Sequence, residues 1–176
     1  MTPAEREVLL EQLNSSREAV RQAVAGLSEA QARFRPAPDR WTVAECVEHV
    51  AVAERQMLRL VTEFRAPAAE PSNRRLDGLI LKGGTDRSKK MQSPDVAVPK
   101  GRYATFGEAL GSFEKARERT LAYVTGCQED LRTFATKHPV VGAIDCYQCL
   151  LVLAVHPARH AKQIEELRND PGFPKE

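Results

Sequence analysis

The chain has 176 residues, of which 42% are hydrophobic and 28% are charged, and its formal net charge at pH 7 is +2. This composition is that of an ordinary globular protein, and the length suits one domain, which we predict to span residues 1–176. The weak charge bias and an aromatic content of 6% argue against a nucleic-acid partner, which would need a basic surface or stacking platforms.

The N-terminal residues are charged and lack the apolar stretch of a signal peptide. The longest apolar run, residues 149–155, is far too short to span a bilayer. We therefore expect a cytoplasmic protein without a membrane partner. In that compartment the four cysteines are expected to be reduced thiols: Cys46, Cys127, Cys146 and Cys149.

Two amphipathic helices are predicted in the first 64 residues. The apolar positions of the first helix are Leu9, Leu13, Val20, Val24 and Leu27. Ser28 and Gln31 then predict the cap of a short turn. The second helix begins after Trp41, where Thr42 and Glu45 have the spacing of a capping box. Its buried face is formed by Val43, Cys46, Val47, Val50, Met57, Leu60 and Phe64.

Residues 66–104 break this pattern with four prolines and the pair Gly83-Gly84. A short helix is predicted over residues 72–81, ended by the glycines. A connection of this length is often functional. Its basic residues could attract an anionic substrate, but we favour a solvated loop because aspartates are interspersed. These basic residues are Arg74, Arg75, Lys82, Arg87, Lys89, Lys90, Lys100 and Arg102.

The third helix begins at Thr105, which has the capping-box spacing with Glu108, and ends at Gly126. A turn region follows, in which we interpret His138 as exposed and without a role. Asp145 and Gln148 predict the start of the fourth helix. Because no segment shows strand alternation, the prediction is an all-α four-helix bundle with a long crossover between its second and third helices.

The histidines of the fourth helix are the most informative residues of the chain. His156 and His160 stand at i and i+4 within the apolar stripe, so both imidazoles point into the bundle. An unpaired polar group there costs about 1–3 kcal/mol. A metal ion shared with His49 of the second helix would satisfy them, and hydrogen-bonded core histidines are the alternative. Three histidines leave an open coordination position, which is typical of catalytic rather than structural sites; zinc fits best, and nickel or iron also suit imidazole.

Pro157 stands between the two histidines of the fourth helix. A proline inside a helix removes one backbone hydrogen bond and costs about 3 kcal/mol. The helix either bends mildly there and keeps the i, i+4 geometry, or breaks and restarts at Pro157, which would separate the two side chains.

Other polar residues near these motifs have two interpretations each. Contacts to the metal ligands or to a substrate are possible for Glu48, Glu54, Arg159 and Gln163, although we favour surface charges on helices. Cys46 lies one turn before His49 and could close the metal site as a fourth ligand. The Cys146-x-x-Cys149 spacing resembles a redox or metal pair, but we interpret both as small buried side chains.

Two motifs resemble the DinB-like superfamily of damage-inducible-type four-helix bundles. They are WTVAECVEHV at residues 41–50 and HPARHAKQI at residues 156–164, with a weaker resemblance in residues 93–95, 99–101 and 108–124. The resemblance covers about residues 5–170. It implies an up-down-down-up bundle, a homodimer, and a divalent metal, typically zinc or nickel, on His49, His156 and His160.

Relatives in that superfamily include metal-dependent thiol S-transferases that use bacillithiol, mycothiol or glutathione, and maleylpyruvate isomerases. The prediction is therefore a metal-dependent enzyme that acts on a small molecule, either as an S-transferase with a low-molecular-weight thiol or as a hydrolase. A metal lowers the pKa of a coordinated thiol or water, which serves both reactions. The alternatives are a non-catalytic metal-binding or stress-response bundle, which a fourth protein ligand would favour, and a bundle that has lost its metal.

Overall fold

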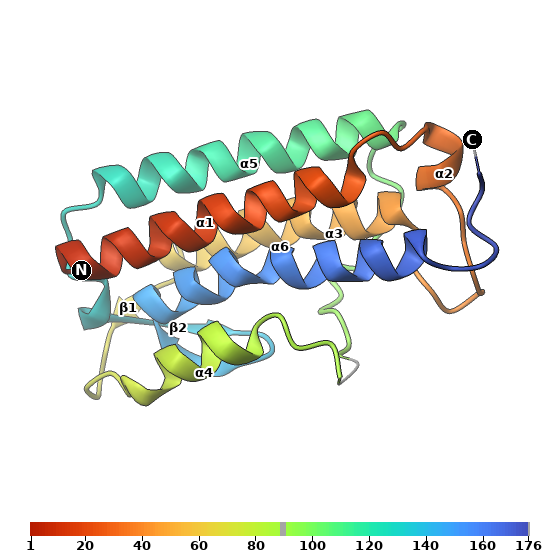
Figure 1. Ribbon diagram of the computed structural model, residues 1–176. Helices are drawn as coiled ribbons and strands as arrows, with labels where there is room; N and C mark the ends of the chain where they lie inside the picture. The colour runs from red at the N-terminus through yellow and green to blue at the C-terminus, as the bar shows by residue number, and fades with distance from the viewer. Residues whose placement is uncertain (89–90, 176) are drawn as a thin grey trace.

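The computed structural model describes residues 1–88 and 91–175, and these are mostly helical (Figure 1). Four long helices form a bundle: α1 (Pro3–Val24), α3 (Val43–Thr62), α5 (Phe106–Gly126) and α6 (Cys146–Arg168). Helices α1 and α3 each pack against α5 and α6, so they lie diagonally across the bundle. In Figure 1, α1 and α6 run from left to right and α3 and α5 run from right to left. Of the helices that the structure describes, none is long and apolar enough to cross a membrane.

Local hydrogen bonds explain where the long helices begin. Reciprocal capping boxes start α1, α3 and α6, and another starts the short helix α2 (Glu29–Ala32). At α5 the predicted box is only half formed. Thr105 accepts a hydrogen bond from the Glu108 amide, whereas the Glu108 carboxylate accepts one from the Ala104 amide instead of the Thr105 amide.

Two apolar clusters fill the bundle, and all four long helices contribute to each. A mid-bundle polar layer separates them, because every long helix carries a buried or half-buried polar side chain near its middle: Ser16, Glu54, Arg117, and His156 with His160. Arg117 is fully buried and donates to both carboxylate oxygens of Glu54 at 2.7 and 2.8 Å. Our interpretation of Glu54 as a surface charge is therefore wrong, because its partner comes from the facing helix α5.

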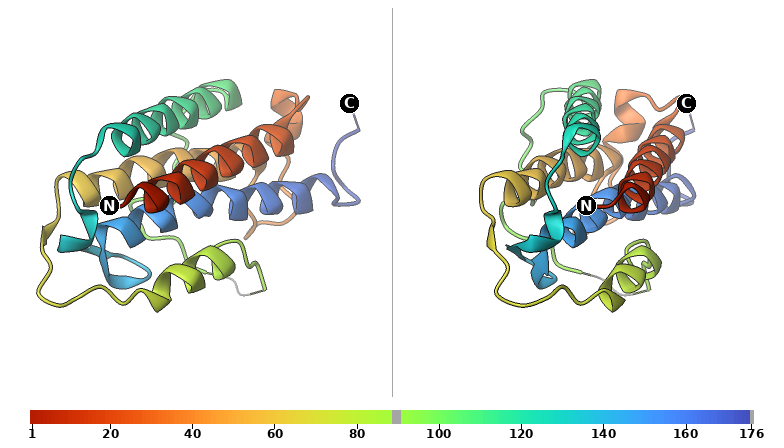
Figure 2. Two further views of the ribbon diagram at one scale, coloured as in Figure 1. Left: turned by 60° about the vertical axis from the view of Figure 1, so that its left-hand side comes forward. Right: turned by 90° about the vertical axis from the view of Figure 1, so that its left-hand side faces the viewer.

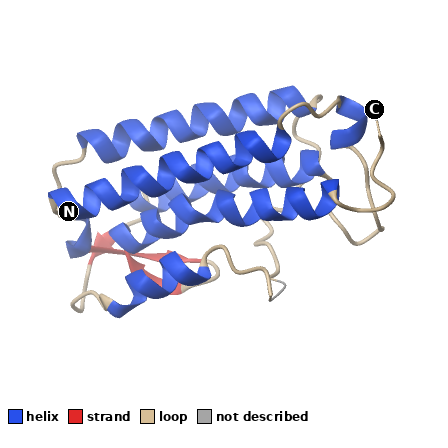
Figure 3. Cartoon of the chain, in the orientation of Figure 1, coloured by secondary structure: helices blue, strands red, loops and turns tan. Residues whose placement is uncertain are grey.

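The prediction that the chain contains no strands is also wrong. A three-stranded antiparallel sheet, in the order β1-β2-β3, is formed by β1 (Ala66–Pro67), β2 (Phe134–His138) and β3 (Gly142–Asp145) (Figure 3). Residue His138 pairs with Gly142, whose φ of +89° allows the tight turn. Strands this short hold too few residues for alternation to stand out from a turn region.

The crossover between α3 and α5 contains secondary structure. It contributes β1 and then α4 (Arg75–Gly83), which begins three residues later than predicted and packs against α6 (Figure 2). The end of α4 lies close to α6 at Gly84, where an added Cβ would clash with the Val155 side chain. Lys89 and Lys90 of the predicted basic connection lie outside the described residues.

Candidate metal centre

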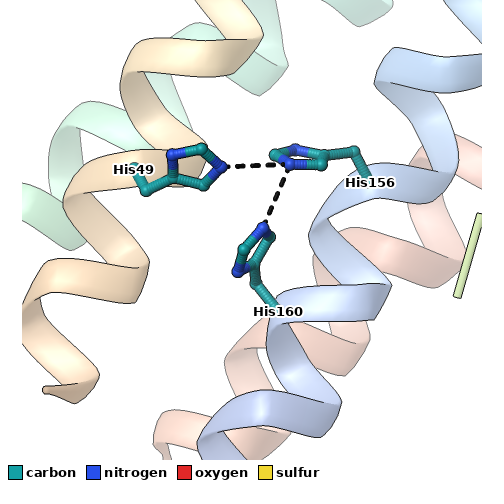
Figure 4. A group of neighbouring side chains, drawn as sticks. All are labelled: His49, His156 and His160. Carbon is teal, nitrogen blue, oxygen red and sulfur yellow. Dashed lines mark hydrogen bonds between the residues drawn. The ribbon is translucent and has the colours of Figure 1, made fainter. Parts of the chain in front are cut away.

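The three histidines singled out from the sequence meet between α3 and α6 (Figure 4). The Nε2 atom of His156 lies 3.1 Å from the Nε2 atom of His49 and 3.1 Å from that of His160. Candidate ligand nitrogens of all three side chains lie within 4.8 Å of one another. The predicted meeting of His49 with the pair on the last helix is thus found in the structure.

Helix α6 continues from Cys146 to Arg168 with Pro157 inside it. Of the two outcomes considered for Pro157, the break is therefore wrong. The i, i+4 relation of His156 and His160 is preserved, so one helix delivers two imidazoles to the same point.

The surroundings of the three imidazoles favour their neutral form. Burial lowers the pKa of His49, and it lowers the pKa of His156 and His160 well below the usual range. Mutual repulsion between the imidazoles lowers the pKa values of His156 and His160 further. Metal binding requires this neutral form, because a protonated nitrogen has no lone pair to offer.

Hydrogen bonds assign the tautomers of two of these histidines. His49 Nδ1 lies 2.8 Å from the Ala97 carbonyl oxygen, and His160 Nδ1 lies 3.0 Å from Gln163 Oε1. Arg87 also donates to that Gln163 oxygen, at 3.2 Å, which fixes the orientation of the amide. Since both acceptors are oxygens, each Nδ1 carries the proton and each Nε2 presents a lone pair to the centre.

The described protein groups do not satisfy the hydrogen-bonding capacity of both ring nitrogens of His156. Its Nε2 faces two lone pairs but can carry only one proton, and its buried Nδ1 has no hydrogen-bond partner among the residues that the structure describes. A cation among the three nitrogens would use every lone pair. Tetrahedral zinc with its usual bonds to nitrogen would separate two ligand nitrogens by about 3.3–3.4 Å, close to the 3.1 Å found here. The donor set therefore fits a divalent metal ion.

Cys46 does not take part in this cluster. Among the described residues, the group that could hold a metal consists of the three histidines, with no fourth protein ligand. The Cys46 thiol is buried, and burial raises its pKa. Cys146 and Cys149 are also free thiols buried in the core, as predicted.

Glu48, next to His49, anchors the crossover beside the centre. Its carboxylate accepts hydrogen bonds from the backbone amides of three consecutive residues, 100–102, and from the Arg102 guanidinium at 2.6 Å. Burial opposes ionisation, but these bonds hold the Glu48 pKa below its usual range. Gly101, with a φ of +67°, lets consecutive amides converge on one carboxylate. The interpretation of Glu48 as a surface charge is wrong for this reason.

Trp41 covers one side of the centre. Its ring lies 4.9 Å from the His49 ring and 6.2 Å from the His160 ring, measured between centroids. In the sequence, Trp41 directly precedes Thr42, the cap residue of α3. Because the His160 ring comes from a distant part of the chain, no local signal could have revealed this second contact.

A cleft of about 1020 Å³ opens onto the three histidines. Five of the six large apolar side chains that are exposed in the described part of the chain line it: Leu79, Met91, Val96, Val140 and Val141. Half-buried Arg159 and Gln163 also line the cleft. Gln163 contacts a candidate metal ligand, His160, so for this residue the interpretation as a surface side chain is wrong. The cleft thus combines an apolar rim with a polar floor.

His138 lines the same cleft and is 7% exposed. The prediction that His138 is exposed is wrong, because His138 ends strand β2, which packs on the bundle. Several basic residues of the crossover form ion pairs: Arg74 with Glu5, Arg87 with Glu166 and Arg102 with Glu48.

Comparisons with known proteins agree with this description. YfiT from Bacillus subtilis, described as a probable metal-dependent hydrolase with an unusual four-helix bundle topology, has a similar structure, with a TM-score of 0.61 and 18% identity. The match covers 99% of this chain and 91% of YfiT, and at this identity it shows the fold alone. The uncharacterized protein YuaE of Bacillus subtilis (strain 168) is 21% identical over 145 residues, which are 81% of this chain and 86% of YuaE. The DinB superfamily model matches residues 12–164, which are most of the chain. The chain therefore belongs to the DinB superfamily.

Proposed function

We propose that this protein is a metal-dependent hydrolase of small molecules, with a divalent ion held by His49, His156 and His160. The observation that carries the proposal is the convergence of three imidazoles, two of which are oriented by hydrogen bonds at Nδ1 with Nε2 toward the centre. A divalent ion at such a site supplies Lewis acidity and lowers the pKa of a coordinated water or thiol.

The chain's own residues prepare this chemistry. The Ala97 carbonyl and Gln163 hold two histidines in the ligating tautomer, and such supporting groups typically change metal affinity 10–100-fold. Trp41 shields two of the imidazole rings on one side. The apolar rim suits the apolar part of a substrate and excludes water from it.

Two alternatives use the same residues. A thiol S-transferase would bind a low-molecular-weight thiol at the open position, whereas a non-catalytic bundle would use the metal for stability only. Absence of a fourth ligand among the described residues favours the enzymatic roles. Hydrolysis is preferred because YfiT, which shares the fold, is described as a probable metal-dependent hydrolase.

The proposal retains several points from the sequence and the family resemblance. They are zinc or nickel as the metal, a single domain over residues 1–176, a homodimer, a cytoplasmic location, and an up-down-down-up topology with the crossover between α3 and α5. The helix directions in Figure 1 support the topology. Light scattering of the purified protein tests the dimer.

Metal content is the first test. We expect about one equivalent of zinc or nickel in the wild-type protein and none in the variant His49→Ala, His156→Ala, His160→Ala. His138→Asn changes a histidine of the same cleft that is not in the cluster, so it should keep the full equivalent. No metal after reloading, or equal metal in the triple variant, contradicts the proposed site.

Activity is then measured with the metal-loaded protein. We expect hydrolysis of p-nitrophenyl octanoate that a chelator abolishes and added metal restores. A parallel assay supplies bacillithiol, mycothiol or glutathione with chlorodinitrobenzene. Turnover only in the thiol assay would favour the S-transferase, and metal binding without turnover in either assay would favour the non-catalytic role.

A further inference from the structure

His138 has a defined orientation at the end of β2, the central strand of the sheet. Burial alternates along the end of β2: Thr136 and His138 are buried, and Lys137 between them is exposed. Because alternate residues of a strand share a face, His138 lies on the face that packs against α3 and α6. The side chain thus approaches the histidine centre from the sheet, independently of both helices.

Two backbone amides assign the tautomer of His138. The amides of Val140 and Val141 donate to its Nδ1 at 3.2 and 3.1 Å. Nδ1 therefore carries the lone pair, and in the neutral imidazole the proton is on Nε2. Burial lowers the pKa of His138, which favours this neutral form. The tautomer is the opposite of that held by His49 and His160, so His138 Nε2 offers a hydrogen and not a ligand lone pair.

His138 lines the cleft, and its Nε2–H is available for a hydrogen bond. Within residues 1–88 and 91–175 it has no protein acceptor, and it is not among the buried polar atoms that lack a partner, so solvent reaches it. His138 lines the cleft together with His156 and is near enough that its positive form would repel a proton on His156. The available donor therefore belongs to a residue that lines the space a substrate would occupy.

The same two hydrogen bonds also position an apolar surface. Val140 and Val141 are 43% and 40% exposed, and both line the cleft. Since their own amides bind His138 Nδ1, one set of contacts places a hydrogen-bond donor beside two apolar side chains. Switching His138 to the other tautomer would break both bonds, so the residue is suited to donating and not to acting as a general base.

We propose that His138 binds the substrate by donating its Nε2–H to an acyl oxygen, and that the substrate is an acyl compound whose apolar chain lies against Val140 and Val141. This inference rests on the proposed function for the identity of the cleft as the substrate site. It adds a catalytic residue from β2 and a substrate class, apolar esters or amides.

Two variants separate the two roles of His138. Asparagine at this position keeps a side-chain oxygen that can accept from the following amides, as in an Asx turn, but removes the donor from the cleft. Glutamine places an amide N–H near the original Nε2 position and so retains the donor. The pair His138→Asn and His138→Gln thus distinguishes loss of the donor from loss of the turn.

Octanamide is the probe, because it offers a carbonyl oxygen and an apolar chain without a chelating group. We expect saturable binding to the metal-free protein, with a shift of the ¹⁵N-labelled His138 Nε2–H signal. His138→Asn should bind it about 3- to 10-fold more weakly, as expected for one neutral hydrogen bond, with an unchanged melting temperature. His138→Gln should lie closer to wild type.

Equal affinity in wild type and His138→Asn, a proton found on Nδ1, or no saturable binding would each overturn the inference. Metal content is measured on the same samples. Because octanamide binding needs no metal, a protein that binds octanamide through His138 but takes up no metal would refute the proposed function and leave the role of His138 intact.

Discussion

Replacing Glu54 by glutamine removes one charge from an ion pair that lies wholly inside the bundle. The side chains of Arg117 and Glu54 are 0% and 1% exposed, and the guanidinium also donates to Ser16 of α1. Glutamine has nearly the shape of glutamate, so packing is preserved. What changes is that the Arg117 charge no longer has a counter-charge.

The expected cost is set by burial. Leaving one member of a buried pair unpaired typically destabilises a protein by about 3–5 kcal/mol. The total free energy of unfolding of a domain is only about 5–15 kcal/mol. Glu63→Gln is the matched control, because Glu63 pairs with Arg59 and these side chains are 51% and 47% exposed. An exposed i, i+4 pair contributes about 0.3–0.5 kcal/mol.

The assay is urea unfolding of the metal-free protein, followed by far-ultraviolet circular dichroism. A double variant, Glu54→Leu with Arg117→Met, removes both charges and should regain most of the lost stability, since an apolar replacement of a buried pair is often neutral or stabilising. The reasoning is refuted if Glu54→Gln costs no more than Glu63→Gln, or if the double variant is less stable than Glu54→Gln.

Three other predictions concern the surroundings of the centre. Gln163→Leu removes the acceptor of His160 Nδ1 and should weaken zinc binding about 10–100-fold in a chelator competition; Gln56→Leu in the same cleft should not. Burial lowers the pKa of His49, His138, His156 and His160, so the unfolded chain binds protons first as the pH falls through about 6.5. Stability is then present above that pH and lost below it, by about 1.4 kcal/mol at pH 5.5 for each histidine that stays neutral in the fold; a melting temperature unchanged down to pH 5 would contradict this. Gly101→Ala forces a side chain into a φ of +67° and should cost about 1–2 kcal/mol in urea unfolding, whereas Gly111→Ala within α5 should stabilise.

Local signals in the sequence predicted the helices well. The capping residues at Thr42 and Asp145 form hydrogen bonds with residues three positions away, so neighbouring sequence decides them. The same holds for His156 and His160, whose shared face follows from helical spacing alone. With His49 on a second apolar face, the sequence could point to all three members of the centre.

Contacts between distant segments decided the rest. Glu48 and Glu54 are buried because Arg102 and Arg117 reach them from other parts of the chain, and a charge pattern on one helix cannot reveal such partners. His138 became part of the cleft through pairing of two short strands against the bundle. By itself the sequence determined which residues could bind a metal, because side-chain chemistry and helical period are local. Only the tertiary structure decided which charges are buried, which tautomers are held and what lines the cleft, because burial and hydrogen bonding depend on segments that folding brings together.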